Sequence, residues 1–160
     1  MTKIKNKFIF IGITIFCVLA LLFTYFVEHV LKHAPCNLCL IERIPYMTTI
    51  IIASSVLLFS KYEKIALHAI GLIFAIGMIV SFYHFGIEQG FFKESLVCDL
   101  VEGNSAESIK DLLRELNTKN ISCKDITFRI FGFSLATFNT IISLVISVII
   151  LRTGLNYDKN

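Results

Sequence analysis

The sequence predicts an all-α membrane protein, a four-transmembrane-helix bundle in which residues 1–160 form a single domain. Hydrophobic residues make up 56% of the chain, whereas a typical soluble domain contains roughly 45–50% apolar residues. Only 17% of the residues are charged, and they cluster, so that long stretches carry no charge at all. Because lipid offers the backbone no hydrogen-bond partner, such stretches are expected to be helices.

Four apolar runs set the order of these helices. A helix needs about 20 apolar residues to cross a hydrocarbon core of about 30 Å. The run from Phe8 to Val27 has twenty residues without a charge, and the runs Ile65 to Ile87 and Ile130 to Leu151 are also long enough. The second run, which ends at Phe59, is shorter and must take its first turn from "CNLCLIER". The expected transmembrane helices therefore cover residues 8–28, 41–60, 65–87 and 130–151, each to within a few residues.

The first apolar run is expected to stay in the protein rather than to be cleaved as a signal peptide. Lys3, Lys5 and Lys7 resemble the basic start of a signal peptide. However, the run is longer than the usual apolar core of about 7–15 residues, and no small-residue cleavage pattern follows it.

Basic residues at the helix ends predict the orientation. Lysines precede the first helix, two more lie in the "SKYEK" turn after the second, and Arg152 and Lys159 follow the fourth. Flanks rich in lysine and arginine lie in the cytoplasm according to the positive-inside rule. Both termini are therefore expected on the cytoplasmic side, with the loops 29–40 and 88–129 outside.

The five cysteines follow this division. Cys17 lies inside the first apolar run and is expected to be a buried core thiol. Cys36 and Cys39 fall in the first external loop, and Cys98 and Cys123 fall in the second. Disulfides persist outside the cytoplasmic membrane, so the partition suggests the pairs Cys36–Cys39 and Cys98–Cys123.

The position of the Cys-x-x-C motif favours a reactive thiol. Pro35 marks the start of a helix, and unpaired amide groups at a helix N-terminus stabilise a thiolate. Arg43 lies four positions after Cys39, so on a helix it shares the same face and could support a thiolate or bind an oxygen of an electron-poor cofactor. The alternative is that Arg43 extends to lipid headgroups and pairs with Glu42 or Glu28.

Three motifs resemble those of the disulfide bond formation protein B (DsbB) family. "PCNLCLIER" is similar to its Pro-Cys-x-x-Cys-x-x-Glu-Arg signature. "YHFGIEQGFF" resembles its tyrosine-histidine segment, and "CKDITFRIFGFSLATFN" resembles the opening of its fourth helix. The resemblance extends from Phe8 to Leu151, nearly the whole chain.

The resemblance implies a membrane thiol oxidase of the bacterial inner membrane, with periplasmic cysteine loops. A soluble thioredoxin-like dithiol oxidase (DsbA-like) would reduce the Cys98–Cys123 disulfide, most readily at Cys98. Electrons would pass by thiol–disulfide exchange to Cys36–Cys39 and then to a membrane quinone, ubiquinone or menaquinone, with Cys39 nearest the ring. Arg43 would contact the quinone, and His84 would lie near it or carry protons. The alternative for His84 is an interfacial histidine that water or a neighbour satisfies.

Other residues receive weaker assignments. His29 and His33 flank the first cysteine pair, but no metal site is expected, and the role of Glu42 stays open. Glu88 is expected to form structural pairs, and Asn139 to hydrogen-bond within the bundle. Residues 105–120 have the spacing of a short amphipathic helix, which would rest on the membrane surface or pack on the bundle.

The main alternative function is a structural one, in which two external disulfides only staple the loops. Nucleic acid is not expected as a partner, because the sequence has no basic stripe, and no glycine-rich phosphate loop is visible. The protein is expected to be monomeric.

Overall fold

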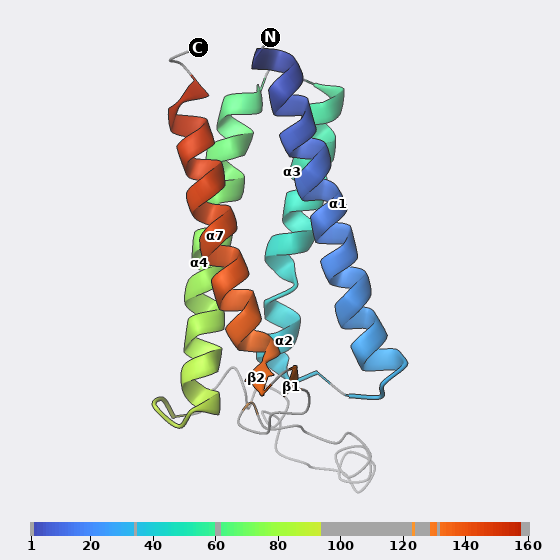
Figure 1. Ribbon diagram of the computed structural model, residues 1–160, viewed down its shortest axis with the longest axis vertical. Helices are drawn as coiled ribbons and strands as arrows, with labels where there is room; N and C mark the ends of the chain where they lie inside the picture. The colour runs from blue at the N-terminus through green and yellow to red at the C-terminus, as the bar shows by residue number, and fades with distance from the viewer. Residues whose placement is uncertain are drawn as a thin grey trace, which may run out of the picture.

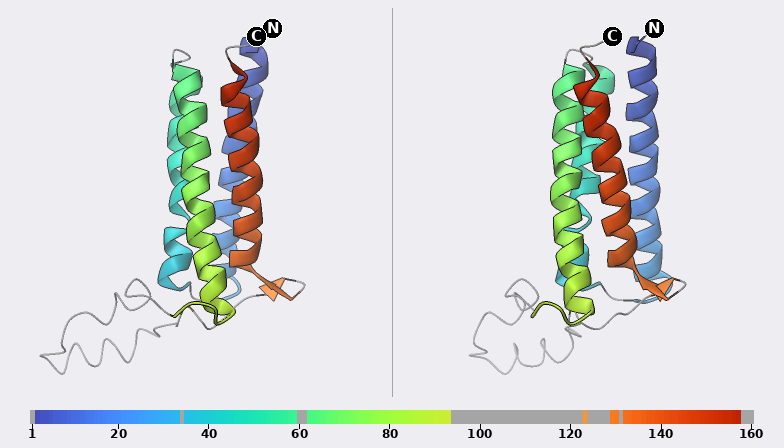
Figure 2. Two further views of the ribbon diagram at one scale, coloured as in Figure 1. Left: turned by 90° about the vertical axis from the view of Figure 1, so that its left-hand side faces the viewer. Right: turned by 60° about the vertical axis from the view of Figure 1, so that its left-hand side comes forward.

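The computed structural model describes residues 2–33, 35–59, 62–93, 123, 129–130 and 132–157. Their elements are α1 (Thr2–His29), α2 (Asn37–Ile41), α3 (Ile44–Leu58), α4 (Glu63–Glu88), β1 (Arg129–Ile130), β2 (Phe133–Ser134) and α7 (Leu135–Leu155). The helices run side by side along the long axis (Figures 1 and 2). Both ends of the chain lie at one end of the bundle, whereas α2 and the β1–β2 pair lie at the other (Figure 1).

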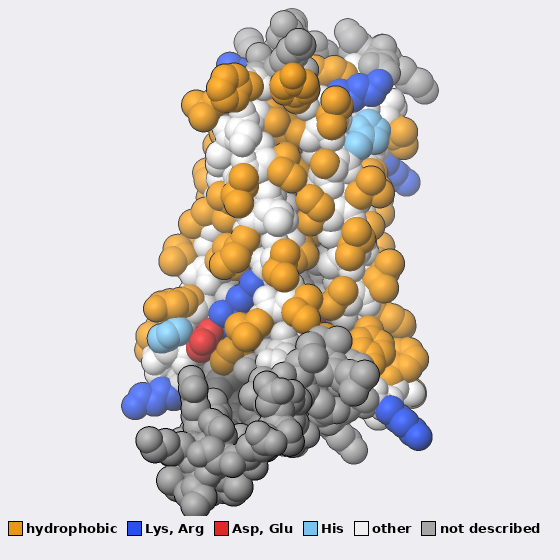
Figure 3. All heavy atoms as spheres, turned by 180° about the vertical axis from the view of Figure 1, so that it is seen from behind, with side chains coloured by type: hydrophobic (Ala, Val, Ile, Leu, Met, Phe, Trp, Pro, Cys, Tyr) orange, Lys and Arg blue, Asp and Glu red, His pale blue; other side chains and the backbone are white. Residues whose placement is uncertain are grey.

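Four helical segments are long and apolar enough to cross a membrane, namely Lys7–His29, Asn37–Leu58, Glu63–Glu88 and Leu135–Leu155. Hydrophobic side chains cover the shaft of the bundle, and most lysine and arginine side chains lie near its two ends (Figure 3). An apolar outer surface is stable in lipid, where it would be costly in water. The predicted fold class, a four-span helical membrane protein, is confirmed, while the expected helix at 105–120 lies outside the described residues.

The second span is broken between α2 and α3. Pro45 lies in the first turn of α3, and a proline has no N–H to bond the carbonyl of Ile41, four residues earlier. The turn at the break closes instead through the Arg43 N–H, which donates to the Leu40 carbonyl at 3.2 Å. The span begins at Asn37, earlier than the predicted residue 41, because Cys36 caps α2 at this point. The break places Glu42 and Arg43 at an irregular turn within the span.

The fourth helix begins at Leu135, not at Ile130 as predicted from hydropathy. Residues 129–130 and 133–134 pair as antiparallel strands, and Gly132 has a φ of +87°, which interrupts any helix there. Ser134 then caps α7, because its Oγ accepts a hydrogen bond from the Thr137 N–H at 3.2 Å. The apolar run therefore contains a short hairpin followed by a helix.

Helices α4 and α7 pack closely, and α1 packs on α3. Small residues allow the close contact between α4 and α7. Ser147 of α7 donates a hydrogen bond to the Gly71 carbonyl of α4 at 2.9 Å. The core between the helices contains Phe10, Cys17 and Phe74, each almost fully buried. Cys17 is a free, buried thiol, as expected.

Candidate functional site

Cys36 and Cys39 face each other at the N-terminus of α2. Cys36 is the N-cap residue, and its Sγ accepts a hydrogen bond from the Cys39 N–H at 3.4 Å. The two Sγ atoms are 2.9 Å apart and both cysteines are free thiols, compared with about 2.03–2.05 Å for a disulfide. Cys36 is buried and Cys39 is partly exposed. The pair is placed for exchange between dithiol and disulfide.

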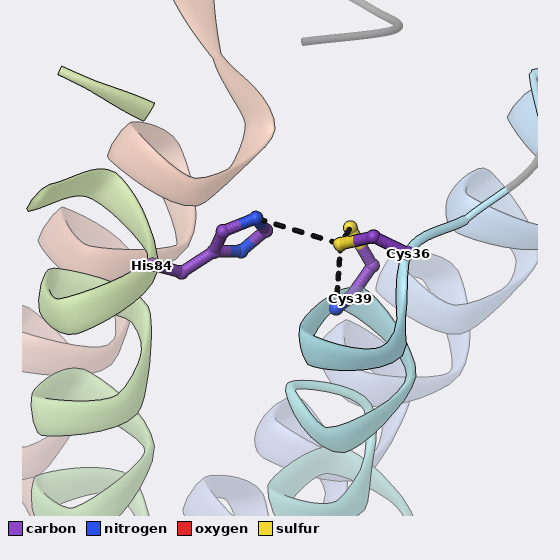
Figure 4. Close-up of side chains that lie close together, drawn as sticks. All are labelled: Cys36, Cys39 and His84. Atoms are coloured by element: carbon purple, nitrogen blue, oxygen red, sulfur yellow. Dashed lines mark hydrogen bonds between the residues drawn. The ribbon is translucent and has the colours of Figure 1, made fainter. Parts of the chain in front are cut away.

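His84 of α4 points across the bundle toward Cys36 (Figure 4). Its Nε2 lies 3.5 Å from the Cys36 Sγ, and its Nδ1 lies 2.7 Å from the Glu42 Oε1. Because an ionised carboxylate can only accept hydrogen bonds, Nδ1 carries a hydrogen, and Nε2 faces the sulfur, where it can accept the thiol proton or, once protonated, donate to the thiolate. The three side chains thus form a buried thiol–imidazole–carboxylate series.

Asn139 of α7 fixes Glu42 at the end of this series. Its Nδ2 donates to the Glu42 Oε2 at 2.9 Å and to the Ser81 Oγ at 2.6 Å. The Tyr46 hydroxyl donates to the Asn139 Oδ1. Asn139 therefore hydrogen-bonds within the bundle as predicted, and it connects α7 with the span that carries the cysteines.

The surroundings of Cys36 favour its thiolate. The hydrogen bond from the Cys39 thiol lowers the pKa of Cys36 below that of an ordinary cysteine. Burial opposes this effect, while the hydrogen bond and the charge of His84 act in the same direction as Cys39. The sequence pointed to the helix N-terminus as the cause. The Cys39 N–H at the start of α2 does lower the pKa of Cys36, but the side chains of Cys39 and His84 contribute more.

Arg43 forms an ion pair with Glu28 of α1, with 2.7 Å between Nη1 and Oε2. This is one of the two pairings considered from the sequence. Both side chains also line the cavity beside the cysteines. Arg43 is therefore held at the cavity wall rather than extended freely into lipid.

A cavity of about 500 Å³ contains the site. Its polar wall includes Cys36, Cys39, Glu42, Arg43, His84 and Glu88. Its apolar wall comes mainly from α1 and α7, for example Phe23 and Phe138. A second cavity of about 440 Å³, lined only by Gly12 and apolar side chains, lies between the same two helices and shares Phe16 and Ile142 with the first.

Cys123 also lines the larger cavity. It is buried and disulfide-bonded, and it belongs to an apolar cluster with Cys36, Leu38 and Ile87. Cys98, its predicted partner, lies outside the described residues. One cysteine of the second loop thus packs in the same cluster as the first cysteine pair.

The remaining candidates divide between the site and the surface. Glu88 lies near the site, with its Oε1 3.8 Å from the His84 Nε2. His29 is exposed and stacks on Tyr25, with 3.9 Å between the ring centroids. His33 lines the cavity. No role was assigned to Glu42 from the sequence, although a glutamate within a predicted transmembrane span was itself a signal of function.

The fold and site define a helical membrane protein with two adjacent free thiols, those of a Cys-x-x-Cys motif, at one end of its bundle. The chain belongs to the DsbB family, because the family described as "Disulfide bond formation protein DsbB" matches residues 6–153. This confirms the family inferred from the motifs and makes the chain a membrane protein of a disulfide bond formation family.

One curated relative is "Uncharacterized protein RP370" of Rickettsia prowazekii (strain Madrid E). It is 28% identical to this chain over 147 residues, which cover 89% of this chain and 84% of the relative. No solved structure matches the chain.

Proposed function

We propose that the protein is a quinone-dependent thiol oxidase that reoxidises a DsbA-like dithiol oxidase and thereby supports disulfide formation in exported proteins. The observation that carries this proposal is that Cys36, Cys39, Cys123 and Arg43 all border one cavity. In this proposal, thiol exchange and the binding of an apolar electron acceptor take place in the same cavity.

In this proposal electrons pass through two cysteine pairs. The reduced partner attacks the Cys98–Cys123 disulfide, with Cys98 as the expected point of attack, and leaves with its own disulfide formed. The resulting dithiol reduces the Cys36–Cys39 disulfide by the same kind of exchange. Each exchange moves two electrons and two protons. After the second exchange, the Cys36–Cys39 dithiol therefore carries the two electrons and two protons that came from the partner. The shared apolar cluster of Cys36 and Cys123 supports the second exchange.

Arg43 and His84 would hold the ring of a quinone, and the apolar side chains of the second cavity would hold its tail. A quinone accepts two electrons and two protons, which returns Cys36–Cys39 to the disulfide. Arg43 would donate to a ring oxygen, and the apolar tail would lie in the second cavity, between α1 and α7. His84, held by Glu42, would receive the Cys36 proton at Nε2. Ubiquinone and menaquinone both have the required ring and tail.

The proposed place of the protein is the bacterial inner membrane, with both termini in the cytoplasm and the cysteine end in the periplasm. The lysines and arginines of the termini support this orientation through the positive-inside rule. The location also matches the chemistry, because disulfides persist in the periplasm and quinones dissolve in the membrane.

A turnover assay tests the proposal. The purified protein in detergent is mixed with a reduced DsbA-like oxidase and a soluble quinone, and quinone absorbance is followed. We expect turnover that is lost in Cys36→Ser, Cys39→Ser, Cys98→Ser and Cys123→Ser but kept in Cys17→Ser. Turnover that survives the loss of either pair would instead favour disulfides that only staple the loops.

Arg43 is tested separately by its effect on quinone use. Arg43→Ala should raise the KM for quinone about tenfold or more, equivalent to losing one charge-assisted hydrogen bond. The KM for the reduced partner should change little. An unchanged KM for quinone would leave Arg43 with only its ion pair to Glu28.

A further inference from the structure

We propose that the reduced Cys36–Cys39 dithiol and His84 together form a binding site for a soft divalent cation, with Zn²⁺ as the best-fitting ion. The ligand atoms of these three residues lie within 4.8 Å of one another. Two thiolates and an imidazole are the ligands that zinc prefers, and three protein ligands with an open fourth position are typical of accessible zinc sites. This ligand set differs from the one considered from the sequence, which involved His29 and His33.

His84 is oriented as a metal-binding histidine. Metal-bound histidines usually donate their second ring N–H to a carboxylate, which fixes the ring and raises its basicity. The Nδ1 of His84 makes this contact with the Glu42 Oε1 at 2.7 Å. The Nε2 atom then faces the sulfur of Cys36 at 3.5 Å (Figure 4). The same geometry that suits a proton acceptor also suits a metal ligand.

The distances require only small side-chain movements. Zinc–sulfur bonds of about 2.3 Å at a tetrahedral angle place two sulfurs about 3.8 Å apart. The Sγ atoms of Cys36 and Cys39 are 2.9 Å apart, and the Cys36 Sγ is 3.5 Å from the His84 Nε2. Rotation of the partly exposed Cys39 side chain about its Cα–Cβ bond would lengthen the distance between the two Sγ atoms without moving the α2 backbone.

The charge of the cavity favours a cation. Its described lining includes the carboxylates of Glu28, Glu42 and Glu88 but only one arginine, Arg43, which pairs with Glu28. The Glu88 Oε2 is buried and has no hydrogen-bond partner among the described residues. Its Oε1 lies 3.8 Å from the His84 Nε2, so Glu88 or a water molecule can complete the coordination.

Binding would depend on the redox state. Coordination releases the protons of both thiols and transfers no electrons, whereas disulfide formation removes both thiolate ligands. Metal binding and oxidation of Cys36–Cys39 are therefore mutually exclusive, and Zn²⁺ would hold the pair in its reduced form. This inference needs neither a quinone nor a partner protein, so it stands or falls separately from the proposed function.

Cobalt(II) is a suitable probe, because thiolate–cobalt bonds give a strong charge-transfer absorption. The full-length chain with Cys98→Ser and Cys123→Ser, which leaves Cys36 and Cys39 as the loop thiols, is reduced with a phosphine and titrated with Co²⁺ in detergent. We expect one Co²⁺ per chain with a thiolate charge-transfer band, displaced by Zn²⁺. The same chain with Cys36–Cys39 oxidised should show no band.

Substitutions then test the ligand set. His84→Gln should weaken Co²⁺ binding at least about tenfold, and Glu42→Gln should weaken it by about 10- to 100-fold. Cys17→Ser and Glu63→Gln are matched controls, a buried thiol and a buried carboxyl away from the site, and should leave the band unchanged. Equal Co²⁺ binding by the reduced and oxidised chains, a comparison that needs no substitution in the site, would overturn the proposal. So would an unaltered spectrum and affinity in His84→Gln.

Discussion

At the scale of single residues, the site depends on how Cys36, His84 and Glu42 are oriented by their hydrogen bonds. Glu42 is 8% exposed and His84 is 3% exposed. A buried carboxylate is costly unless it is paired and hydrogen-bonded, and Glu42 receives hydrogen bonds from both His84 and Asn139. These contacts keep a hydrogen on the Nδ1 of His84 and leave its Nε2 for Cys36.

The lowered pKa of Cys36 predicts a thiolate that persists in mildly acidic solution. An ordinary thiol with a pKa of about 8.5 is almost fully protonated at a pH of about 6. In the reduced protein, the ultraviolet absorbance of the Cys36 thiolate should persist from a pH of about 8 to about 6, and it should be lost only as the pH falls through the lowered pKa. Cys36→Ser should abolish this signal, and Cys17→Ser should keep it. A midpoint at the ordinary value would contradict the assignment.

Cys39→Ala, which removes the donor, should also shift this titration, because the hydrogen bond from the Cys39 thiol is the largest cause of the lowered pKa. The midpoint should move upward. It should stay below that of an ordinary cysteine, since the contact with His84 remains.

A second prediction compares two buried glutamates. Glu42→Gln keeps the shape of the side chain but removes the charged acceptor that orients the His84 ring through Nδ1. Oxidation of the Cys36–Cys39 dithiol by a soluble quinone should slow by about 100-fold, which is typical for the loss of an acid–base group. Glu63 is also buried but belongs to the first turn of α4 and accepts from the Tyr157 hydroxyl.

Glu63→Gln should therefore leave the oxidation rate close to that of the wild type. Stopped-flow measurement of single-turnover oxidation separates this step from partner binding. Equal slowing in both variants would indicate a general effect of removing buried charge, not a role of Glu42 at the site.

At the scale of elements, close packing of α4 on α7 holds the two halves of the site together. His84 lies on α4 and Asn139 on α7, so the network exists only if these helices keep their register. Gly71 allows the close approach, since a Cβ built at this position would lie 2.6 Å from the Leu151 side chain. The Ser147–Gly71 hydrogen bond lies at the same contact.

Gly71→Ala should therefore destabilise the bundle by about 1–3 kcal/mol, the usual cost of overpacking. Unfolding in mixed detergent and sodium dodecyl sulfate, followed by circular dichroism, measures this change. Gly12→Ala is the matched control on α1, where an added Cβ meets no atom within 4 Å. Its free energy of unfolding should be unchanged or slightly higher. A neutral Gly71→Ala would mean that Leu151 moves aside at little cost.

The break between α2 and α3 is the second important element. In a continuous helix, the directions of the Glu42 and Arg43 side chains would be set by the regular helical spacing. The break at Pro45 instead allows Glu42 to turn toward His84 while Arg43 reaches Glu28 on α1. An irregular turn at membrane depth is tolerated because it lines a cavity inside the protein.

At the scale of the whole molecule, Cys36 and Cys39 belong to the start of α2, which lies at the end of the bundle opposite to the termini (Figure 1), and Cys123 packs in the same cluster as Cys36. The proposed orientation predicts that a reporter fused after Asn160 remains in the cytoplasm. A fused fluorescent protein that requires the cytoplasm should fluoresce, and a fused alkaline phosphatase should be inactive. Active phosphatase at this position would reverse the orientation and place the Cys36–Cys39 pair on the wrong side for exported proteins.

Much of this architecture could be predicted from the sequence, because each transmembrane helix must contain its own run of apolar residues. The charge-free run from Phe8 to Val27 falls inside α1, and the run from Ile65 to Ile87 falls inside α4. The fourth helix was predicted too early at Ile130, because hydropathy does not distinguish a short apolar hairpin at Gly132 from a helical turn. The Cys-x-x-C motif and its family could also be read directly, since its residues are adjacent in the chain.

The sequence by itself therefore determined the membrane class, the family and the cysteine pair, because these depend on composition and on neighbouring residues. Only the tertiary structure decided which partners those residues have. Glu42, His84 and Asn139 are separated by up to 97 positions in the chain and meet because three helical segments pack at one end of the bundle. The physical reason is that hydropathy specifies which segments enter the membrane, whereas close packing between helices specifies which of their few polar side chains must satisfy one another.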